Sequence, residues 1–464
     1  MTEVFGKVRN IHFVGIGGIG MSGLAEILHS MGFKITGSDI ADSANCKRLR
    51  AMGIGVFIGH LAENAVGADA VVYSSAVRSS NPELIYAREN FIPVIKRGEM
   101  LAELMRMKYS IAIAGSHGKT TTTSMVAEIF NKAELDPTVV VGGILNRRDS
   151  NALKGNSNIM IAEADESDKS FLMLQPTVAV ITNIDFEHTD TYATMDEVKD
   201  SFRDFASRVP FYGLNVLCLD DANTAELIKR IDRRFMTYGL SAQADVHSAD
   251  IEKHGFAVSF GVVIHGKNMG RINLNFPGEH NVQNALAAIA VATEFDIPFR
   301  VCKKALEEFE GVQRRLTVRY DGNCCTVLDD YGHHPTEIKT TLKAIREAYG
   351  SRRIVVVFQP HRYSRTQTLM NEFSTCFFDA DRLFITDIYA ASEEPIEGIT
   401  SQVLVKEIKE RGFKDVHYLP SFDDIYKYLE EAGCDNSLIL TQGAGSITRF
   451  SGELAAWLEN KHEK

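Results

Sequence analysis

The segment Gly115 to Thr120, with the sequence GSHGKT, combines the residue types that bind nucleotide phosphates. It follows an apolar run and precedes a segment of helical composition, which is the strand–loop–helix context of a P-loop. Backbone N–H groups in such a loop point at an anion, and the dipole of the next helix favours negative charge. Lys119 would contact the outer phosphates and the Thr120 hydroxyl would contact Mg²⁺. The same phosphate site is predicted to include Ser116, His117, Gly118 and Thr121.

Acidic residues follow two further apolar runs, at the positions where predicted strands end. NIMIAEADESD contains Glu163 and three more acids, and VAVITNIDFEHTD ends in acids around His188. Ligands gather outside the carboxyl ends of strands in open α/β sheets, and Mg²⁺ prefers oxygen ligands. We therefore predict a metal site near the P-loop, although acids at a strand end can also be ordinary solvated loop residues.

The N-terminal segment GIGGIGMSG carries a second glycine-rich turn after a predicted strand. Gly15, Gly17 and Gly20 form G-x-G-x-x-G, and Asp39 lies where a ribose-binding acid is expected. Alone, this pattern would favour NAD. Because a P-loop lies downstream, we interpret the turn as the site of a UDP diphosphate, with further contacts from Gly18, Ser74 and Ser75.

Two arginines, Arg362 and Arg365, follow the predicted strand 354–358. Their guanidinium groups could both reach one carboxylate, whose geometry a planar fork matches well. A surface ion pair is the alternative. His333 and His334 precede Pro335, which is predicted to start a helix, and His333 is a candidate base or a hydrogen-bonding group.

Composition restricts the class of protein. The chain has 464 residues, 45% of them hydrophobic, and a net charge of −11, which disfavours a general nucleic-acid binder. Its seven scattered cysteines form no C-x-x-C pair, and neither a secretion signal nor a membrane-spanning run is evident. We expect a reduced, cytoplasmic protein without a membrane partner; the sequence leaves monomer and homodimer open.

Alternating strand and helix patterns predict an α/β protein with three domains. The first, residues 1–107, is expected to be a Rossmann-like domain that binds the UDP substrate. The second, residues 108–311, would be a P-loop ATPase with a mostly parallel sheet plus antiparallel strands. The third, residues 312–464, would be another Rossmann-like domain, which binds an amino acid.

Eight segments together resemble the Mur ligase family, which uses ATP to join amino acids to UDP-muramoyl precursors of peptidoglycan. In chain order they are HFVGIGGIGMSGLAEIL, AGSHGKTTTT, EADESD, TNIDFEHTD, FPGEHNVQNALAA, DDYGHHPTEI, FQPHRYSRT and GAGSI. They span residues 11–447, and DYGHHP and QPHRYSR favour the alanine-adding members. The resemblance implies an acyl-phosphate mechanism that joins L-alanine to UDP-N-acetylmuramate and releases ADP and phosphate.

The resemblance also implies roles for individual residues. Lys119, Asp330, His333 and Arg362 would be catalytic, and Thr120, Glu163 and His188 would belong to the Mg²⁺ shells. His333, Arg362 and Arg365 would bind the amino acid. Additional contacts to ATP are expected from Asn281, Asn284, Arg315 and Tyr363.

Three alternatives remain at the level of sequence. A ligase that adds a recycled peptide to the same sugar nucleotide belongs to the same class. An NAD-dependent dehydrogenase would account for the first glycine turn, and a non-catalytic nucleotide switch would account for the P-loop.

Overall fold

A computed structural model describes residues 5–145, 150–188, 190–322, 324–432 and 436–462. Contacts group the chain into two compact units. The first unit comprises residues 1–249, 262–270 and 283–308; the second comprises 250–261, 271–282 and 309–464. The strands form three sheets, and the predicted three-domain α/β architecture is confirmed. The predicted domain boundaries stay predictions.

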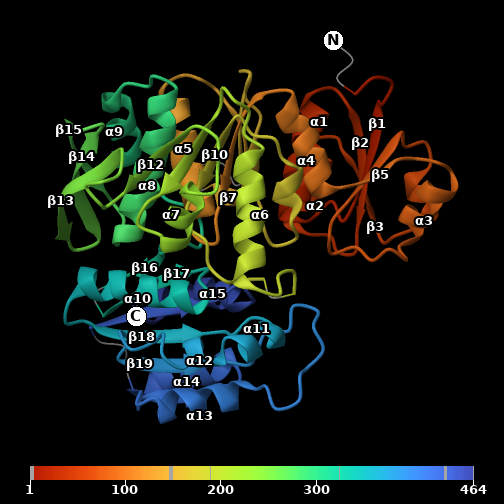
Figure 1. Cartoon of the computed structure of the whole chain (residues 1–464). Coiled ribbons are helices and arrows are strands. Elements are labelled where there is room, and N and C mark those ends of the chain that lie inside the picture. Colours follow the sequence, from red (N-terminus) through yellow and green to blue (C-terminus); the bar gives the residue numbers. More distant parts are fainter. Residues whose placement is uncertain (1–4, 146–149, 189, 323, 433–435, 463–464) are drawn as a thin grey trace. The chain divides into compact units, whose positions relative to one another are not determined.

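The first sheet contains five parallel strands in the order β3-β2-β1-β4-β5. Its order reverses between β1 and β4, which places the loops after these strands at a topological switch point. Helices α1 and α4 lie on one face and α3 on the other (Figure 1). The elements are β1 (Asn10–Val14), α1 (Ile19–Ser30), β2 (Lys34–Asp39), α2 (Ala44–Ala51), β3 (Gly55–Ile58), η1 (Ala62–Ala65), β4 (Ala70–Tyr73), α3 (Pro82–Glu89), β5 (Val94–Lys96) and α4 (Arg97–Arg106).

The second sheet has ten strands in the order β15-β14-β13-β12-β11-β10-β6-β9-β7-β8. The P-loop strand β6 is paired in parallel with β9 on one side and β10 on the other, so the loops after all three strands emerge at one edge. The elements are β6 (Tyr109–Ala114), α5 (Lys119–Lys132), β7 (Thr138–Leu145), β8 (Ser150–Leu153), β9 (Ile159–Glu163), η2 (Ser170–Met173), β10 (Val178–Ile181), α6 (Met195–Ser207), β11 (Leu214–Cys218), α7 (Ala222–Ile228), β12 (Phe235–Gly239), β13 (Val246–His254), β14 (Ala257–Ile264), β15 (Lys267–Leu274), α8 (Glu279–Glu294) and α9 (Phe299–Glu307).

Strands β13, β14 and β15 correspond to the predicted antiparallel insertion. They continue the second sheet, since β13 pairs in parallel with β12. The links from β13 to β14 and from β14 to β15 are each two residues long, a length that joins antiparallel neighbours.

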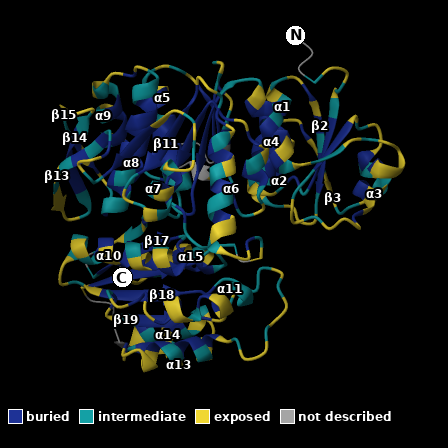
Figure 2. Cartoon of the chain, in the orientation of Figure 1, coloured by how far each residue is buried: buried dark blue, intermediate teal, exposed yellow. Residues whose placement is uncertain are grey.

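The third sheet has the order β16-β17-β21-β18-β19-β20 and is parallel except for the edge pair β16–β17. Its central strands are buried, whereas exposed residues gather on helices and loops (Figure 2). The elements are β16 (Thr317–Asp321), β17 (Cys325–Asp330), α10 (Pro335–Tyr349), β18 (Arg353–Phe358), α11 (Tyr363–Thr368), α12 (Met370–Phe373), β19 (Arg382–Ile385), α13 (Ser401–Glu410), β20 (Val416–Tyr418), α14 (Phe422–Ala432), β21 (Ser437–Gln442) and α15 (Ile447–His462).

In the described part of the chain, no helix is both long enough and apolar enough to cross a membrane. The six cysteines described there form no disulfide bond with one another.

Candidate active site

The P-loop joins β6 to α5, as its sequence predicted. Gly118 is the N-cap of α5 with φ +81°, and Gly115 has φ +132°. A β-carbon on Gly115 would lie 2.0 Å from the Thr182 hydroxyl oxygen, so a side chain there would collide with the neighbouring strand end. Glycine is required at both positions because their backbone conformations strain other residues.

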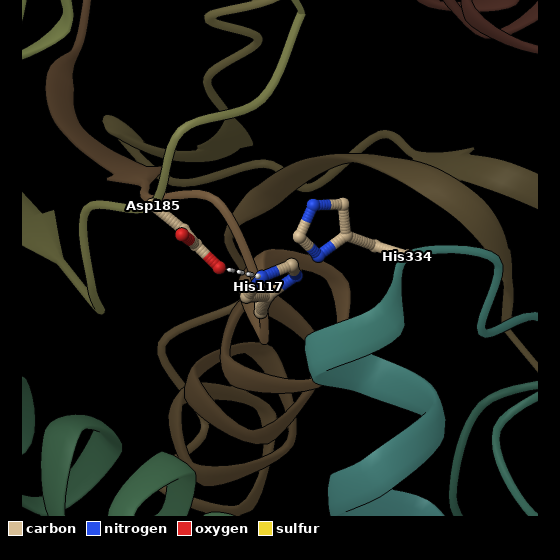
Figure 3. Close-up of side chains that lie close together, drawn as sticks. All are labelled: His117, Asp185 and His334. Atoms are coloured by element: carbon tan, nitrogen blue, oxygen red, sulfur yellow. Dashed lines mark hydrogen bonds and ion pairs between the residues drawn. The ribbon is translucent and has the colours of Figure 1, made fainter. Parts of the chain in front are cut away.

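The loop after β10 holds the P-loop in place. Ser116 N–H donates to the Asn183 carbonyl at 3.0 Å, and His117 N–H donates to the Asn183 amide oxygen at 2.8 Å. The Asp185 N–H donates to the Ser116 hydroxyl at 2.8 Å, and His117 Nε2 lies 3.2 Å from an Asp185 carboxylate oxygen (Figure 3). The two segments therefore form one rigid edge around the predicted phosphate site.

Lys119 folds back over the loop. Its Nζ donates to the carbonyls of Gly115 and Ser116, at 2.5 and 3.0 Å, and pairs with Glu166 Oε1 at 2.8 Å. Burial opposes the charge on Lys119, but Glu166 and Glu163 outweigh it and raise the pKa of the ammonium group. Lys119 thus stays charged and close to the loop that would receive phosphate oxygens.

Glu166 is the residue that the sequence analysis did not single out. Its side chain is 3% exposed, and Oε1 also lies 3.2 Å from His188 Nε2. Among the described residues its second oxygen, Oε2, has no hydrogen-bond partner. The EADESD segment is acidic throughout, and its sequence does not show which carboxylate faces Lys119.

The predicted metal ligands all lie in the first unit, where Thr120 contacts Glu163 and His188 contacts Glu166. Thr120 Oγ1 donates to Glu163 Oε2 at 2.9 Å, which brings a hydroxyl and a carboxylate together at the start of α5. His188 has φ +55°, and its carbonyl accepts from the N–H groups of Thr191 and Tyr192. Ligand atoms of Glu166, Glu187 and His188 lie within 4.8 Å of one another. A buried, unpartnered carboxylate oxygen in such a cluster fits a hard divalent cation.

The four consecutive threonines have different environments. Thr120 faces Glu163, whereas Thr122 donates to the Asn284 side-chain oxygen at 3.1 Å and Thr123 donates to a carbonyl of its own helix. Thr121 is half-buried in the first turn. Much of the run therefore packs α5 against its surroundings, and the Thr120 hydroxyl is the one that lies at the predicted metal site.

Asn284 also closes the P-loop from the side, because its Oδ1 lies 2.6 Å from the position of a β-carbon on Gly118. Asn281 stands one turn earlier in α8 and donates to the Pro277 carbonyl at 2.8 Å. The Asn281 contact lies within the second unit, as do the predicted ATP contacts Arg315 and Tyr363.

The N-terminal glycine turn is closed by Asp39, whose Oδ2 accepts from the Gly17 N–H at 2.8 Å. Gly15 has φ +82°, and a β-carbon there would lie 3.3 Å from the Ser74 β-carbon. The turn, Asp39 and the strand end of Ser74 and Ser75 therefore meet at the switch point of the first sheet. Gly18 is the N-cap of α1 and Gly20 lies in its first turn.

In the second unit, Asp330 is 4% exposed and organises the loops around it. Its carboxylate accepts from the backbone N–H groups of Leu316 and Gly332, at 3.1 and 2.9 Å, and from the Gln442 amide at 3.2 Å. Burial raises the pKa of Asp330. These contacts indicate that Asp330 holds the surrounding loops in position. The catalytic role predicted for Asp330 stays a prediction.

His333 and His334 precede α10, which begins at Pro335 as expected. His334 is the N-cap and forms a capping box with Glu337 (Figure 3 shows the start of this helix). Burial, Arg365 and His361 lower the pKa of His333 well below its ordinary value. His333 Nδ1 lies 3.1 Å from the Tyr331 carbonyl, which makes Nδ1 the protonated nitrogen and Nε2 an acceptor.

Arg362 is the N-cap of α11 and has φ 72° and ψ 138°, a conformation that is rare outside glycine. Its Nε lies 3.9 Å from Glu393, and Arg365 Nη1 lies 3.2 Å from His361 Nδ1. Tyr363 follows as the first residue of α11. Backbone strain concentrated at the predicted carboxylate-binding arginine supports a functional reason for its position.

Comparisons with known proteins cover nearly the whole chain. Family profiles described as "Mur ligase family, catalytic domain", "Mur ligase middle domain" and "Mur ligase, glutamate ligase domain" match residues 10–109, 113–292 and 314–445. The UDP-N-acetylmuramate–L-alanine ligase of Trichlorobacter lovleyi is 53% identical over 445 residues, 96% of this chain and 98% of that protein. The corresponding ligase of Syntrophotalea carbinolica is 50% identical over 458 residues, 99% of this chain and 100% of that protein.

Solved structures give the same result. The UDP-N-acetylmuramate-alanine ligase of Thermotoga maritima has a TM-score of 0.82 and 30% identity, covering 97% of this chain and 99% of that one. A murein peptide ligase from Psychrobacter arcticus has a TM-score of 0.72 at 24% identity and covers 97% and 99% of the two chains, which shows a shared fold. The protein therefore belongs to the Mur ligase family.

Proposed function

We propose that the protein joins L-alanine to UDP-N-acetylmuramate with ATP, as a ligase in peptidoglycan precursor synthesis. The observation that carries this proposal is the P-loop with Lys119 held by Glu166, in a chain 50–53% identical to alanine-adding ligases. Membership of a ligase family removes support for the dehydrogenase and the nucleotide-switch alternatives. The peptide-recycling alternative is less well supported, since two solved structures of such ligases are 24% and 27% identical to this chain.

Amide formation requires activation of the substrate carboxylate, which ATP provides as an acyl phosphate while ADP leaves. Lys119 neutralises charge on the transferred phosphoryl group, and the P-loop N–H groups orient it; positioning and charge neutralisation dominate such transfers. Thr120, Glu163 and His188 would hold Mg²⁺, which supplies positive charge to the phosphates and the carboxylate. Glu166 keeps Lys119 charged and aimed at the loop.

The amine of L-alanine then attacks the acyl phosphate. Arg362 and Arg365 bind the amino-acid carboxylate, and the unprotonated Nε2 of His333 can accept a proton from the amine. An α-amino pKa of about 8 leaves part of the free amine unprotonated near neutral pH, so His333 gives assistance and is not an absolute requirement.

Phosphate release should be measured with ATP, Mg²⁺ and UDP-N-acetylmuramate across a panel of amino acids and the recycled tripeptide. We expect release with L-alanine, slower release with serine or glycine because one small group is worth only ~1–3 kcal/mol, and none without the sugar nucleotide. Release with the tripeptide but not with L-alanine would replace the proposal by its peptide-recycling alternative. Activity that is equal without Mg²⁺ would refute the metal assignment.

A further inference from the structure

Arg97 is a half-buried cationic group that none of the roles above uses. It is the first residue of α4, and its side chain is 22% exposed. One guanidinium nitrogen, Nη2, lies 3.4 Å from Asp165 Oδ2 in the EADESD segment after β9. On its other side, Cδ and Nη1 both lie 3.1 Å from the position of a β-carbon on Gly20. Arg97 thus stands between the N-terminal glycine turn and the acids beside the P-loop.

The contact with Asp165 leaves most of the guanidinium available. Arginine offers five N–H donors, and the 3.4 Å contact is long for a charge-assisted hydrogen bond. Within the described residues it is the only polar contact of the Arg97 side chain. Asp165 itself has a better partner, because its other oxygen accepts from the Ser167 N–H at 3.0 Å.

The position of Asp165 supports this arrangement. Its single contact with Arg97 fixes the direction of the guanidinium without saturating it. Arg97 is therefore held in place before any ligand arrives, which reduces the entropy lost on binding.

Gly20 explains how the guanidinium reaches the glycine turn. The third glycine of such a motif usually allows close packing of helix and strand. Here its missing side chain makes room for Arg97. Helix α1, which starts at Ile19, has no side-chain cap at Gly18 and no acid in its first turn, so nothing on the helix competes for an anion there.

We propose that Arg97 binds anionic oxygens of the UDP-sugar substrate and thereby connects the glycine turn to the ATP-binding edge. The inference rests on the proposed function, because it takes the glycine turn as the sugar-nucleotide site. The proximity of Arg97 to Gly20 and to the start of α1 favours the diphosphate as the bound group. The carboxylate of the muramoyl group is an anion of the same kind and could bind in the same way. A planar guanidinium can hold two such oxygens at once, which a lysine cannot reproduce.

The test is calorimetric titration of the full chain with UDP, UDP-N-acetylglucosamine and UDP-N-acetylmuramate. Arg97→Gln is compared with Arg106→Gln, which removes an exposed arginine at the far end of the same helix, paired there with Glu103. We expect Arg97→Gln to weaken all three ligands about 10- to 100-fold, Arg97→Lys to be intermediate, and Arg106→Gln to match the unaltered protein.

Each outcome of the titrations either supports or overturns the role of Arg97. A loss confined to UDP-N-acetylmuramate supports the proposal with the carboxylate as the bound group, because the other two ligands lack it. Equal affinities of Arg97→Gln and Arg106→Gln for all three ligands overturn it. An equal loss of ADP affinity in Arg97→Gln also overturns it, since the effect would then be a general disturbance. If the unaltered protein binds no UDP-sugar, the proposed function fails; if it does and Arg97→Gln does as well, only the role of Arg97 fails.

Discussion

Two half-buried histidines, His280 and His361, make the stability of the second unit sensitive to acid. Burial and the charge of Arg315 lower the pKa of His280 to about 4, and burial together with Arg365 and Arg362 lowers the pKa of His361 to about 4. An unfolded histidine has a pKa of about 6.5. At pH 5 the unfolded chain therefore binds a proton at each site and the folded chain does not, so stability is complete above pH ~6.5 and falls as the pH approaches 4.

The magnitude follows from these values. Lowering the pH from 8 to 5 reduces the free energy of unfolding by about 2 kcal/mol for each histidine. For the pair, the reduction is about 4 kcal/mol in the limit of full burial. Both side chains retain some solvent contact, so we expect 2–4 kcal/mol in total, at the order-of-magnitude level. Asp329 and Asp330 act in the opposite direction, because burial raises the pKa of each carboxyl group.

The assay is urea unfolding at several pH values, followed by tryptophan fluorescence. The chain has a single tryptophan, Trp457, which lies in α15 and therefore reports on the second unit. The variant His280→Gln/His361→Gln should lose much of the pH dependence below 6.5. His254→Gln is the control, because that side chain is 61% exposed in the same unit. An unaltered pH dependence in the double variant would refute the linkage reasoning.

Three further predictions concern the active site. Arg362→Gly should leave the melting temperature equal or higher, since glycine tolerates φ 72°. Its kcat/KM for L-alanine should fall about 100-fold, because the charged contact to the carboxylate is lost. A lower melting temperature would contradict the strain argument. Glu166→Gln should lower the free energy of unfolding by about 1–3 kcal/mol and lower kcat at least tenfold, because Lys119 loses its charged partner. Denaturation and phosphate release measure the two effects. A kcat equal to that of the unaltered protein would remove Glu166 from the mechanism. Asn223→Ala should lower kcat a few-fold with little change in melting temperature. The Asn223 amide donates to the Ile184 carbonyl at 2.8 Å and so holds the loop that carries His188. Unchanged steady-state kinetics would show that the loop keeps its position without this hydrogen bond.

Much of the fold follows from local sequence. The P-loop was predictable because a strand, a glycine turn and a helix with Lys119 lie within one short segment. The start of α10 was equally local, since Pro335 fixes the first helical turn and His334 caps it. The hairpin strands β13 to β15 were recognisable as strands, but their continuity with the main sheet depends on the pairing of β12 with β13, which local pattern does not encode.

The candidate site divides in the same way. Sequence alone determined which residue types were available for phosphate, metal and carboxylate chemistry, because each group follows its strand within a few positions. Tertiary structure decided that Glu166, among the acids after β9, faces Lys119, and that Asp330 is tied to backbone N–H groups. It also decided that Arg97 reaches Gly20 and Asp165, which are 77 and 68 residues away along the chain. Such contacts arise because elements distant in sequence pack together in the fold, so no local pattern of spacing or composition predicts them.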